Sequence, residues 1–439
     1  MNPILYLFYY FFKVLVRTST WVYYSKKTVL GQPHHRSRNP CILLSNHPST
    51  VLDPLNVAVE VKDEVYFLAN ASLFKNPVLG WLLRKFYCIP VQRPQDVGGR
   101  PVNNAENFRQ AVRFLSGKGC LYIAPEGSSF VERRLRKLKT GTARIAFAAE
   151  AANDWQLGLT ILPVGLNYTD PTKFRSRCVT FFGQPIRVTD FREQYKTDAV
   201  NAVQCLTEAM AVGLSSLILD CDDHDQDQLL YRLDAMLRNE EPLGTEAKLR
   251  RSQGVLEHLK QWKSADAAGY AAFSALVFDY FERLQLLKIN DLHVKSPTKP
   301  PSPLLYLTLS FPLFALGYAI HFLPVFVTNK ISESIKAELA WLPTFKYGFG
   351  LLLYPMFIIL ETWLFGKLAV LLGLAVWYKW VFLLAVVPLG LLTERWLRSW
   401  KLWQRWNRAE YLYKSQAAIW SQLTGLRQQI LSTAQIFGK

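Results

Sequence analysis

The first half of the chain alternates short apolar runs with stretches of helical periodicity. In one such stretch Phe108, Ala111, Val112 and Leu115 recur at the spacing of one helix face. The short apolar runs predict strands at residues 41–45, 64–69, 87–91, 120–124, 159–165 and 178–183. This alternation predicts an α/β domain, which we place at residues 31–190.

A more charged region with helical periodicity follows at residues 191–288. One apolar stripe within it comprises Leu229, Leu230, Leu233 and Leu237. Such stripes are typical of helices that pack one face against a core. Residues 289–303 contain the run K-S-P-T-K-P-P-S-P, whose composition predicts a linker.

Three long apolar runs then occupy residues 304–392, which we assign to transmembrane helices. Residues 304–327 contain no Asp, Glu, Lys or Arg over 24 positions, a length that suffices for a tilted span. Residues 347–366 and 368–392 are separated only by Lys367 and predict a helical hairpin or a pair of spans.

The remaining residues, 393–439, are basic and aromatic. Trp396, Trp400 and Trp403 lie at helical spacing with Arg and Lys between them, which predicts an interfacial tail at lipid headgroups. The positive-inside rule places this tail in the cytoplasm, whereas three spans starting from a cytoplasmic domain place it outside. Either the number of spans is even, or one segment is re-entrant.

Residues 1–30 begin with an apolar and aromatic run that is followed by Lys13 and Arg17. The run has no basic n-region and no small-residue cleavage site, so it is a poor signal peptide. We favour a membrane-associated helix that lies at the surface over one that spans.

Composition agrees with partial immersion in lipid, because 50% of the residues are hydrophobic and 14% are aromatic. The net charge of +17 favours anionic partners such as phospholipid headgroups, phosphorylated substrates or coenzyme A. No nucleic-acid motif is found, so we expect no nucleic acid. The 6 cysteines include no C-x-x-C pair, so we expect neither disulfides nor a zinc site.

The predicted strand at residues 41–45 leads into the run N-H-P-S-T-V-L-D-P-L at residues 46–55. This order can hold an imidazole at the mouth of a sheet, with a carboxylate near enough to orient it. His47 would then be a general base and Asp53 its orienting partner. Five residues separate the two, which is not a same-face helix spacing, so the loop or the helix start must return Asp53 to the imidazole.

Three further motifs follow in chain order. Residues 88–93, C-I-P-V-Q-R, form an apolar strand that ends in Arg93, a side chain suited to phosphate. Residues 121–129, L-Y-I-A-P-E-G-S-S, end a strand in a turn where Glu126 could hold a substrate hydroxyl or the loop itself. Residues 161–165, I-L-P-V-G, form an apolar strand that contains a proline.

Together these motifs resemble those of the glycerolipid acyltransferases, the glycerol-3-phosphate and 1-acylglycerol-3-phosphate acyltransferase family. That family usually has four residues between His and Asp, and usually Phe where Ala124 stands. A subgroup with N-H-P openings and D-P-L endings shares the longer spacing, and we assign the chain to it. The basic run from Arg133 to Lys139 resembles a stretch of the same family and is either a solvated face or a surface for an anionic donor or lipid.

The resemblance implies an α/β acyltransferase domain, followed by a helical region and a C-terminal transmembrane helical part. It implies that His47 and Asp53 are catalytic, and that Pro163 and Val164 line an acyl pocket. The substrate-binding residues that it implies are Asn46, Arg93, Glu126, Gly127 and Ser128.

The implied function is that of a membrane-bound O-acyltransferase in phospholipid synthesis. It would move a fatty acyl group from acyl-CoA or acyl-carrier protein to the hydroxyl of glycerol-3-phosphate or 1-acylglycerol-3-phosphate, by direct attack and without a covalent acyl-enzyme. The opening motif favours glycerol-3-phosphate. No cofactor is expected beyond the thioester co-substrate, and the catalytic domain of this integral membrane protein is expected on the cytoplasmic side.

A second hypothesis is a non-catalytic membrane scaffold or lipid-binding protein with a degenerate acyltransferase site. The distance between the Asp53 carboxylate and His47 discriminates between the two.

An acidic cluster surrounds His224 and comprises Asp220, Asp222, Asp223, Asp225 and Asp227. Alternating acids can bind Ca²⁺, but the run lacks the glycine and the terminal glutamate of an EF-hand. We therefore favour a solvated helix N-terminus, and expect no metal site.

Overall fold

The computed structural model describes residues 3–31, 40–85, 87–93, 102–297, 303–375 and 377–434. It divides into two compact units. Unit 1 comprises Met1–Cys221 and Ala337–Thr344, and unit 2 comprises Asp222–Lys336 and Phe345–Lys439.

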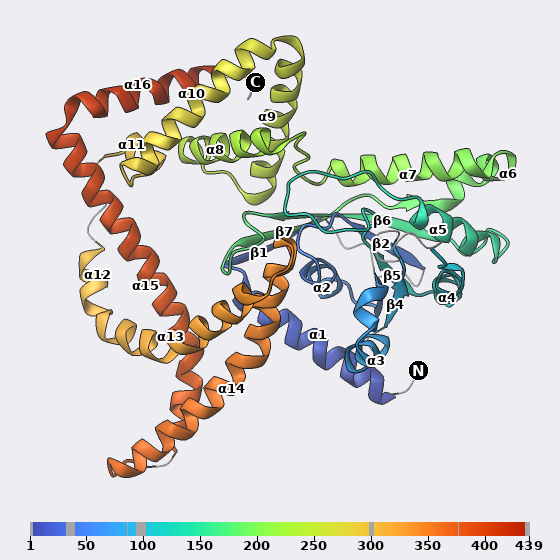
Figure 1. Ribbon diagram of the computed structural model, residues 1–439, viewed down its shortest axis with the longest axis horizontal. Helices are drawn as coiled ribbons and strands as arrows, with labels where there is room; N and C mark the ends of the chain where they lie inside the picture. Colours follow the sequence, from blue (N-terminus) through green and yellow to red (C-terminus); the bar gives the residue numbers. More distant parts are fainter. Residues whose placement is uncertain are drawn as a thin grey trace. The chain divides into compact units, whose positions relative to one another are not determined.

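Unit 1 is built on an 8-stranded sheet with the order β1-β7-β6-β2-β5-β3-β4, and β8 pairs with β6 (Figure 1). The strands are β1 (Lys26–Leu30), β2 (Cys41–Ser45), β3 (Val65–Asn70), β4 (Cys88–Val91), β5 (Cys120–Ile123), β6 (Thr160–Tyr168), β7 (Arg177–Phe182) and β8 (Ile186–Arg187). Strand β2 runs parallel to both β5 and β6, whereas β7 is antiparallel to β6. The predicted α/β class is confirmed, and all six predicted strands are present.

The central strands are apolar on both faces because helices cover the sheet. Every residue of β2 is buried. One core cluster joins Ile42 and Leu121 to helices α4 (Ala105–Ser116), α5 (Gly141–Ala151) and α7 (Ala199–Ser215). Helix α7 therefore belongs to the sheet domain, together with the shorter α6 (Arg192–Thr197), so the predicted start of a separate helical region at residue 191 is too early.

The N-terminal helix α1 covers Pro3–Tyr23, and the chain then enters the sheet as β1, which runs parallel to β7. The predicted helical segment 1–30 thus extends seven residues too far. The side chains of Lys13 and Arg17 bind backbone carbonyl groups elsewhere in unit 1. Lys13 donates to the carbonyls of residues 61–63, and Arg17 donates to that of Val59, where helix α2 (Leu52–Ala58) ends.

The opposite side of α1 is exposed and apolar. Leu7, Phe8, Phe11, Val14 and Trp21 are between 55% and 68% exposed and recur at helical spacing. Lysine and arginine anchor one side of the helix while aromatic residues occupy the other, as in helices that lie in a membrane surface. α1 is not among the helices long and apolar enough to span a membrane.

Two short helices follow β3 in unit 1, η1 (Ala71–Phe74) and α3 (Pro77–Lys85). A third, η3 (Val188–Phe191), lies between β8 and α6. Ala337–Thr344 returns to this unit from far along the sequence and contains the short helix η4 (Leu339–Trp341).

Unit 2 contains α8 (His224–Glu240), α9 (Thr245–Ala265), α10 (Ala267–Leu286), α11 (Asp291–Lys295) and α16 (Ala417–Ala434). Arg427 on α16 donates to Asp291 Oδ1 at 2.8 Å and pairs with Glu240, so α16 is bound to α11 and α8. This part of the predicted tail is a packed helix rather than an interfacial segment. Helix α11 likewise lies within the predicted linker, of which residues 298–302 fall outside the described part.

The apolar part of unit 2 comprises α12 (Leu304–Leu309), α13 (Phe311–Ser334), α14 (Leu342–Leu371) and α15 (Tyr378–Ser415). Among the described residues, three helices are long and apolar enough to cross a membrane, at Phe311–Ser334, Leu339–Leu371 and Tyr378–Ser415. Trp396 is buried and donates to the carbonyl of Leu307, so only part of the predicted aromatic stripe faces outward.

Candidate active site

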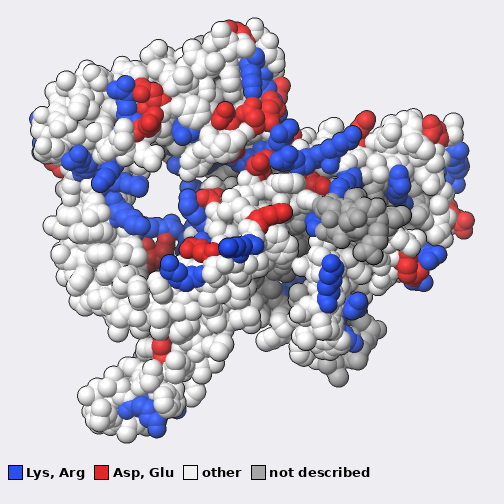
Figure 2. Space-filling view, viewed as in Figure 1, with Lys and Arg blue, Asp and Glu red and all other residues white. Residues whose placement is uncertain are grey.

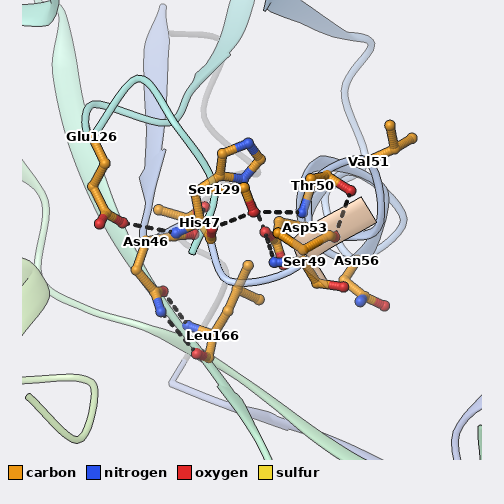
Figure 3. A network of polar contacts seen from close by, with 12 residues as sticks. Asn46, His47, Ser49, Thr50, Val51, Asp53, Asn56, Glu126, Ser129 and Leu166 are labelled. Atoms are coloured by element: carbon orange, nitrogen blue, oxygen red, sulfur yellow. Dashed lines mark hydrogen bonds and ion pairs between the residues drawn. The ribbon is translucent and has the colours of Figure 1, made fainter. Parts of the chain in front are cut away.

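His47 and Asp53 meet at the end of β2. His47 Nδ1 lies 2.9 Å from Asp53 Oδ2, and Asp53 is fully buried at the first turn of α2 (Figure 3). The His47 side chain is 19% exposed, so one face of the ring is accessible. With Nδ1 engaged by a carboxylate, Nε2 is the nitrogen available to a substrate proton.

The conformation of Thr50, in the loop between His47 and Asp53, explains how the Asp53 carboxylate reaches the imidazole. Thr50 has a φ of 39°, a left-handed conformation that is unfavourable for a β-branched residue. Its backbone N–H donates to Ser129 Oγ at 2.9 Å, and Ser129 Oγ donates in turn to the carbonyl of His47 at 2.7 Å. Ser49 N–H donates to Asp53 Oδ2 at 2.7 Å. The tight turn at Thr50 therefore accommodates the extra residue between His47 and Asp53.

Asp53 is held by a second layer of hydroxyl and amide groups. Tyr168 Oη donates to Asp53 Oδ1 at 2.8 Å. Asn56 Nδ2 donates to the hydroxyls of both Tyr168 and Tyr24, at 3.0 Å each. Burial beside the Asp53 carboxylate holds the pKa of Tyr168 well above its usual range, so this hydroxyl remains a donor. Nothing in the sequence motifs pointed to Tyr168, which lies three residues beyond the fourth motif.

The Glu126 carboxylate binds backbone N–H groups of the loops around the site. Its Oε1 accepts from the backbone N–H of His47 at 2.9 Å, and its Oε2 accepts from that of Arg136 at 3.1 Å. Burial raises the pKa of Glu126, although these two hydrogen bonds oppose that shift. Of the two roles considered for Glu126, the structure supports the structural one.

Asn46 is likewise engaged by the backbone. Its amide accepts from Leu166 N–H at 2.7 Å and donates to the Leu166 carbonyl at 3.0 Å, so it ties the end of β2 to β6 (Figure 3). The oxygen and the nitrogen of this side-chain amide thus each bond the backbone, and the contact of Asn46 with substrate stays a prediction.

Two cations flank the Pro125-Glu126-Gly127 turn. Arg93 Nη1 donates to the Gly127 carbonyl at 3.1 Å, and Lys139 N–H donates to that of Pro125 at 2.9 Å. Gly127 has a φ of +75°, and a Cβ there would lie 2.6 Å from Lys139 Nζ, so the lysine side chain crosses the glycine. Arg93 and Lys139 thus place positive charge beside the turn. Lys139 was not singled out from the basic run by sequence.

The remaining predicted residues lie close by. Ser128 follows the same turn in the chain, next to the loop-binding Ser129. Pro163 and Val164 are buried in β6, where Leu44 and Ser45 of β2 are their register partners. A Cβ on Gly213 of α7 would lie 2.8 Å from Pro163 Cγ, so Pro163 packs closely against that helix.

The acidic cluster around His224 is occupied by protein groups. Asp220 accepts from Leu135 N–H at 2.8 Å, whereas Asp222 and Asp223 pair with Lys260 and Lys263. Asp223 caps α8 by accepting from Gln226 N–H. Among the described residues, no group of three or more His, Cys, Asp or Glu side chains could hold a metal ion.

Comparison with known proteins agrees with this site. Residues 26–167, which contain all four motifs, match the family model described as Acyltransferase. The match covers about a third of the chain and shows what these residues are similar to. The match begins at β1 and ends at β6, within the sheet of unit 1.

Two curated yeast proteins are similar to this chain. Glycerol-3-phosphate O-acyltransferase 2 of Saccharomyces cerevisiae is 28% identical over 250 residues, which cover 54% of this chain and 33% of the relative. Glycerol-3-phosphate O-acyltransferase 1 of the same organism is 32% identical over 121 residues, which cover 27% of this chain and 16% of the relative. The chain therefore spans a third or less of the length of these relatives.

Among solved structures, the 1-acyl-sn-glycerophosphate (LPA) acyltransferase PlsC from Thermotoga maritima is matched with a TM-score of 0.32 and 18% identity. The match covers 45% of this chain and 78% of that chain.

Proposed function

We propose that this protein is a membrane-bound O-acyltransferase that transfers a fatty acyl group from a thioester to the hydroxyl of a glycerol phosphate. The observation that carries the proposal is the 2.9 Å contact between His47 Nδ1 and the buried Asp53 carboxylate, inside a domain of the acyltransferase family. A non-catalytic scaffold does not require this pair or its supporting hydrogen bonds, so we disfavour the scaffold alternative.

The geometry of the His47–Asp53 pair supports a direct-transfer reaction. Asp53 fixes the tautomer that carries its proton on Nδ1, and His47 Nε2 removes the proton of the acceptor hydroxyl. The oxygen attacks the thioester carbonyl, and the tetrahedral intermediate expels the thiolate. The imidazolium, stabilised by Asp53, returns the proton to the departing sulfur. No covalent acyl-enzyme is formed.

Arg93 and Lys139 would bind the phosphate of the acceptor beside the Gly127 turn. Glycerol-3-phosphate is the favoured acceptor, because both yeast relatives carry that substrate in their names. Lysophosphatidate is the alternative. The donor would be acyl-CoA or acyl-carrier protein, and Pro163 and Val164 would border the acyl chain.

The cytoplasmic side is the proposed location of the catalytic domain. The second half of α15 carries Arg395, Arg398, Lys401, Arg405 and Arg408, a density of positive charge that the positive-inside rule assigns to the cytoplasm.

An acyl-transfer assay with the purified full chain tests the function. The wild type, His47→Ala and Asp53→Asn would each be given acyl-CoA or acyl-carrier protein with glycerol-3-phosphate, lysophosphatidate or glycerol. We expect both variants to lose at least about a hundredfold in kcat, since each removes the general base or its correct tautomer.

His224→Ala is the matched control, because this exposed histidine lies at the start of α8, in unit 2. Equal rates for His47→Ala and wild type would overturn the mechanism. A wild type that acylates lysophosphatidate but not glycerol-3-phosphate would overturn the favoured acceptor while leaving the mechanism intact.

A further inference from the structure

In the part of the chain that the structure describes, three helices could each cross a membrane by length and composition, yet their flanking contacts do not permit three crossings. We infer that α13 enters and leaves the membrane on one side, with its outer surface against the acyl chains of that leaflet, and that only α14 and α15 cross. The inference concerns membrane topology and goes beyond the acyl-transfer chemistry.

The catalytic sheet is joined to α12 by a continuous stretch of chain. No candidate span occurs among the described residues between β2 and α11, so the catalytic sheet and helices α8–α11 lie on the same side of the membrane. The chain then reaches α12 through the Pro- and Lys-rich run, whose composition excludes a crossing. Helix α13 therefore begins on the catalytic side.

The C-terminal helix α16 lies on the same side of the membrane as α8 and α11. Arg427 on α16 is 8% exposed and binds Asp291 of α11 through Nε at 2.8 Å, and Tyr280 of α10 donates to the same carboxylate at 2.8 Å. An arginine buried between carboxylates of α8 and α11 requires α16 to be on their side. An even number of crossings must therefore separate α12 from the end of α15.

Helix α13 is the apolar helix that does not cross the membrane. The connection between α13 and α14, Ala337–Thr344, belongs to the compact unit of the catalytic sheet. Thr50 Oγ1, in the loop between His47 and Asp53, donates to the Ala340 carbonyl at 3.2 Å and also contacts Thr344 Oγ1. Both ends of α13 are thus on the catalytic side.

The surface of α13 suits this position. Its buried stripe consists of Gly317, His321, Pro324, Thr328 and Ser332, all small or polar. His321 Nε2 contacts the Val386 carbonyl of α15 at 2.9 Å, so the stripe faces protein. The outward side carries large apolar residues, and Phe311, Leu316 and Phe322 are each at least 50% exposed. Polar residues inside and apolar residues outside are typical of helices in contact with lipid.

The surroundings of the N-terminal end of α13 agree with a start near the membrane surface. The ring of Phe314 stacks on that of Trp396 with centroids 3.8 Å apart, and Trp396 Nε1 donates to the Leu307 carbonyl. Arg395 and Arg398 flank this tryptophan in α15. Both arginines are exposed, and exposed arginines near the end of an apolar helix mark the headgroup layer, so α13 starts near that layer rather than at the bilayer centre.

Helices α14 and α15 have the dimensions of a spanning hairpin. The two helices meet near the turn that joins them, where Phe365 of α14 stacks on Phe382 of α15 with centroids 4.8 Å apart (Figure 1). Lys346 and Lys367 lie 21 residues apart on α14, about 32 Å along a helix, close to the thickness of a hydrocarbon core of about 30 Å.

The tip of the hairpin has the composition of a second membrane interface. Figure 2 shows the α14–α15 hairpin mostly white, with an acidic side chain along it and basic ones towards its tip. Lys367 and Lys379 lie there, next to Trp363, Trp377 and Trp380, which are each 57% exposed. Exposed tryptophans with lysines are expected where a hairpin reaches the far headgroups.

Cysteine labelling in sealed vesicles of known orientation tests the topology. Four exposed small residues would be replaced singly in the full chain: Ala337→Cys between α13 and α14, Ala375→Cys at the hairpin tip, Ser264→Cys in α9 and Ser421→Cys in α16. A membrane-impermeant maleimide is added outside, and the unsubstituted chain sets the background from its own six thiols.

We expect Ala337→Cys, Ser264→Cys and Ser421→Cys to react from one side, and Ala375→Cys to react only from the other. Labelling of Ala337→Cys from the side of Ala375→Cys would show that α13 crosses and would overturn the proposal. Labelling of Ala375→Cys from the catalytic side would overturn the spanning hairpin. In detergent all four thiols must react, which controls for folding and accessibility.

Discussion

Tyr168 Oη donates a hydrogen bond of 2.8 Å to Asp53 Oδ1, on the carboxylate that orients His47. The two residues are 115 positions apart in the chain and meet because β6 lies next to β2 in the sheet. This bond orients the carboxylate from the side opposite to the imidazole.

Replacement of this hydroxyl tests its role. Tyr168→Phe is expected to lower kcat by about tenfold, because a hydrogen bond to an ionised group contributes about 1.5–3 kcal/mol and part of that orients the base. Steady-state kinetics at saturating acceptor would measure the loss. Tyr24→Phe is the matched control, since that hydroxyl accepts from Asn56 and makes no hydrogen bond to Asp53 among the described contacts. Equal effects of the two substitutions would contradict the positioning role.

The contact between Thr50 and Thr344 gives a second prediction. Thr344→Val removes the hydroxyl that contacts Thr50 Oγ1 and accepts from Val51 N–H at 3.3 Å. The left-handed conformation of Thr50 needs such support, so the loop is expected to relax and kcat to fall several-fold. Thr344→Ser keeps the hydroxyl and should retain wild-type kcat. A Val variant as active as the Ser variant would argue against this support.

The buried arginine of unit 2 makes a prediction about stability. Arg427→Met leaves the buried carboxylate of Asp291 without its paired cation. The free energy of unfolding of the helical region should therefore fall by about 3–5 kcal/mol. Lys414→Met breaks only an exposed pair with Glu410 and should cost less than about 0.5 kcal/mol. Denaturant titration followed by tryptophan fluorescence compares them. Similar losses in both variants would show that the Arg427 network is not structural.

His293 predicts a pH dependence of stability. Its ring is fully buried, accepts from Asn290 N–H through Nδ1 and lies edge-on to Trp406. Burial lowers the pKa of His293 below its usual value, with a further contribution from Arg405. The unfolded chain therefore takes up this proton at a higher pH than the folded chain, so stability falls as pH drops through the usual histidine range towards the folded pKa.

His293→Gln keeps an acceptor near Asn290 and removes the titration. Its melting temperature should fall less than that of the wild type between about pH 7.5 and 5.5, around the ordinary histidine pKa of about 6.5. Parallel melting curves across this range would contradict the assignment.

The motifs predicted which residues the structure gathers at the candidate site, and their catalytic roles stay predictions. His47, Asp53, Arg93 and Gly127 lie around one edge of the sheet, as their positions after β2, β4 and β5 require. The roles of Glu126 and Asn46 were less accessible, because a side chain that binds backbone and one that binds substrate have the same signature in sequence. Tyr168, Ser129 and Lys139 were missed as site residues for a related reason, since each acts through a spatial neighbour that is remote in the chain.

The sequence by itself determined the α/β class, the strand positions and the presence of three long apolar helices, because these depend on local periodicity and composition. It left the number of crossings open, since hydropathy measures whether a helix can enter lipid and not where its ends are held. Only the tertiary structure decided that Thr344 lies against the catalytic loop and that Arg427 is buried against Asp291. The tertiary structure also decided that Nδ1 is the imidazole nitrogen engaged by Asp53, because this depends on the geometry of the loop and not on residue spacing.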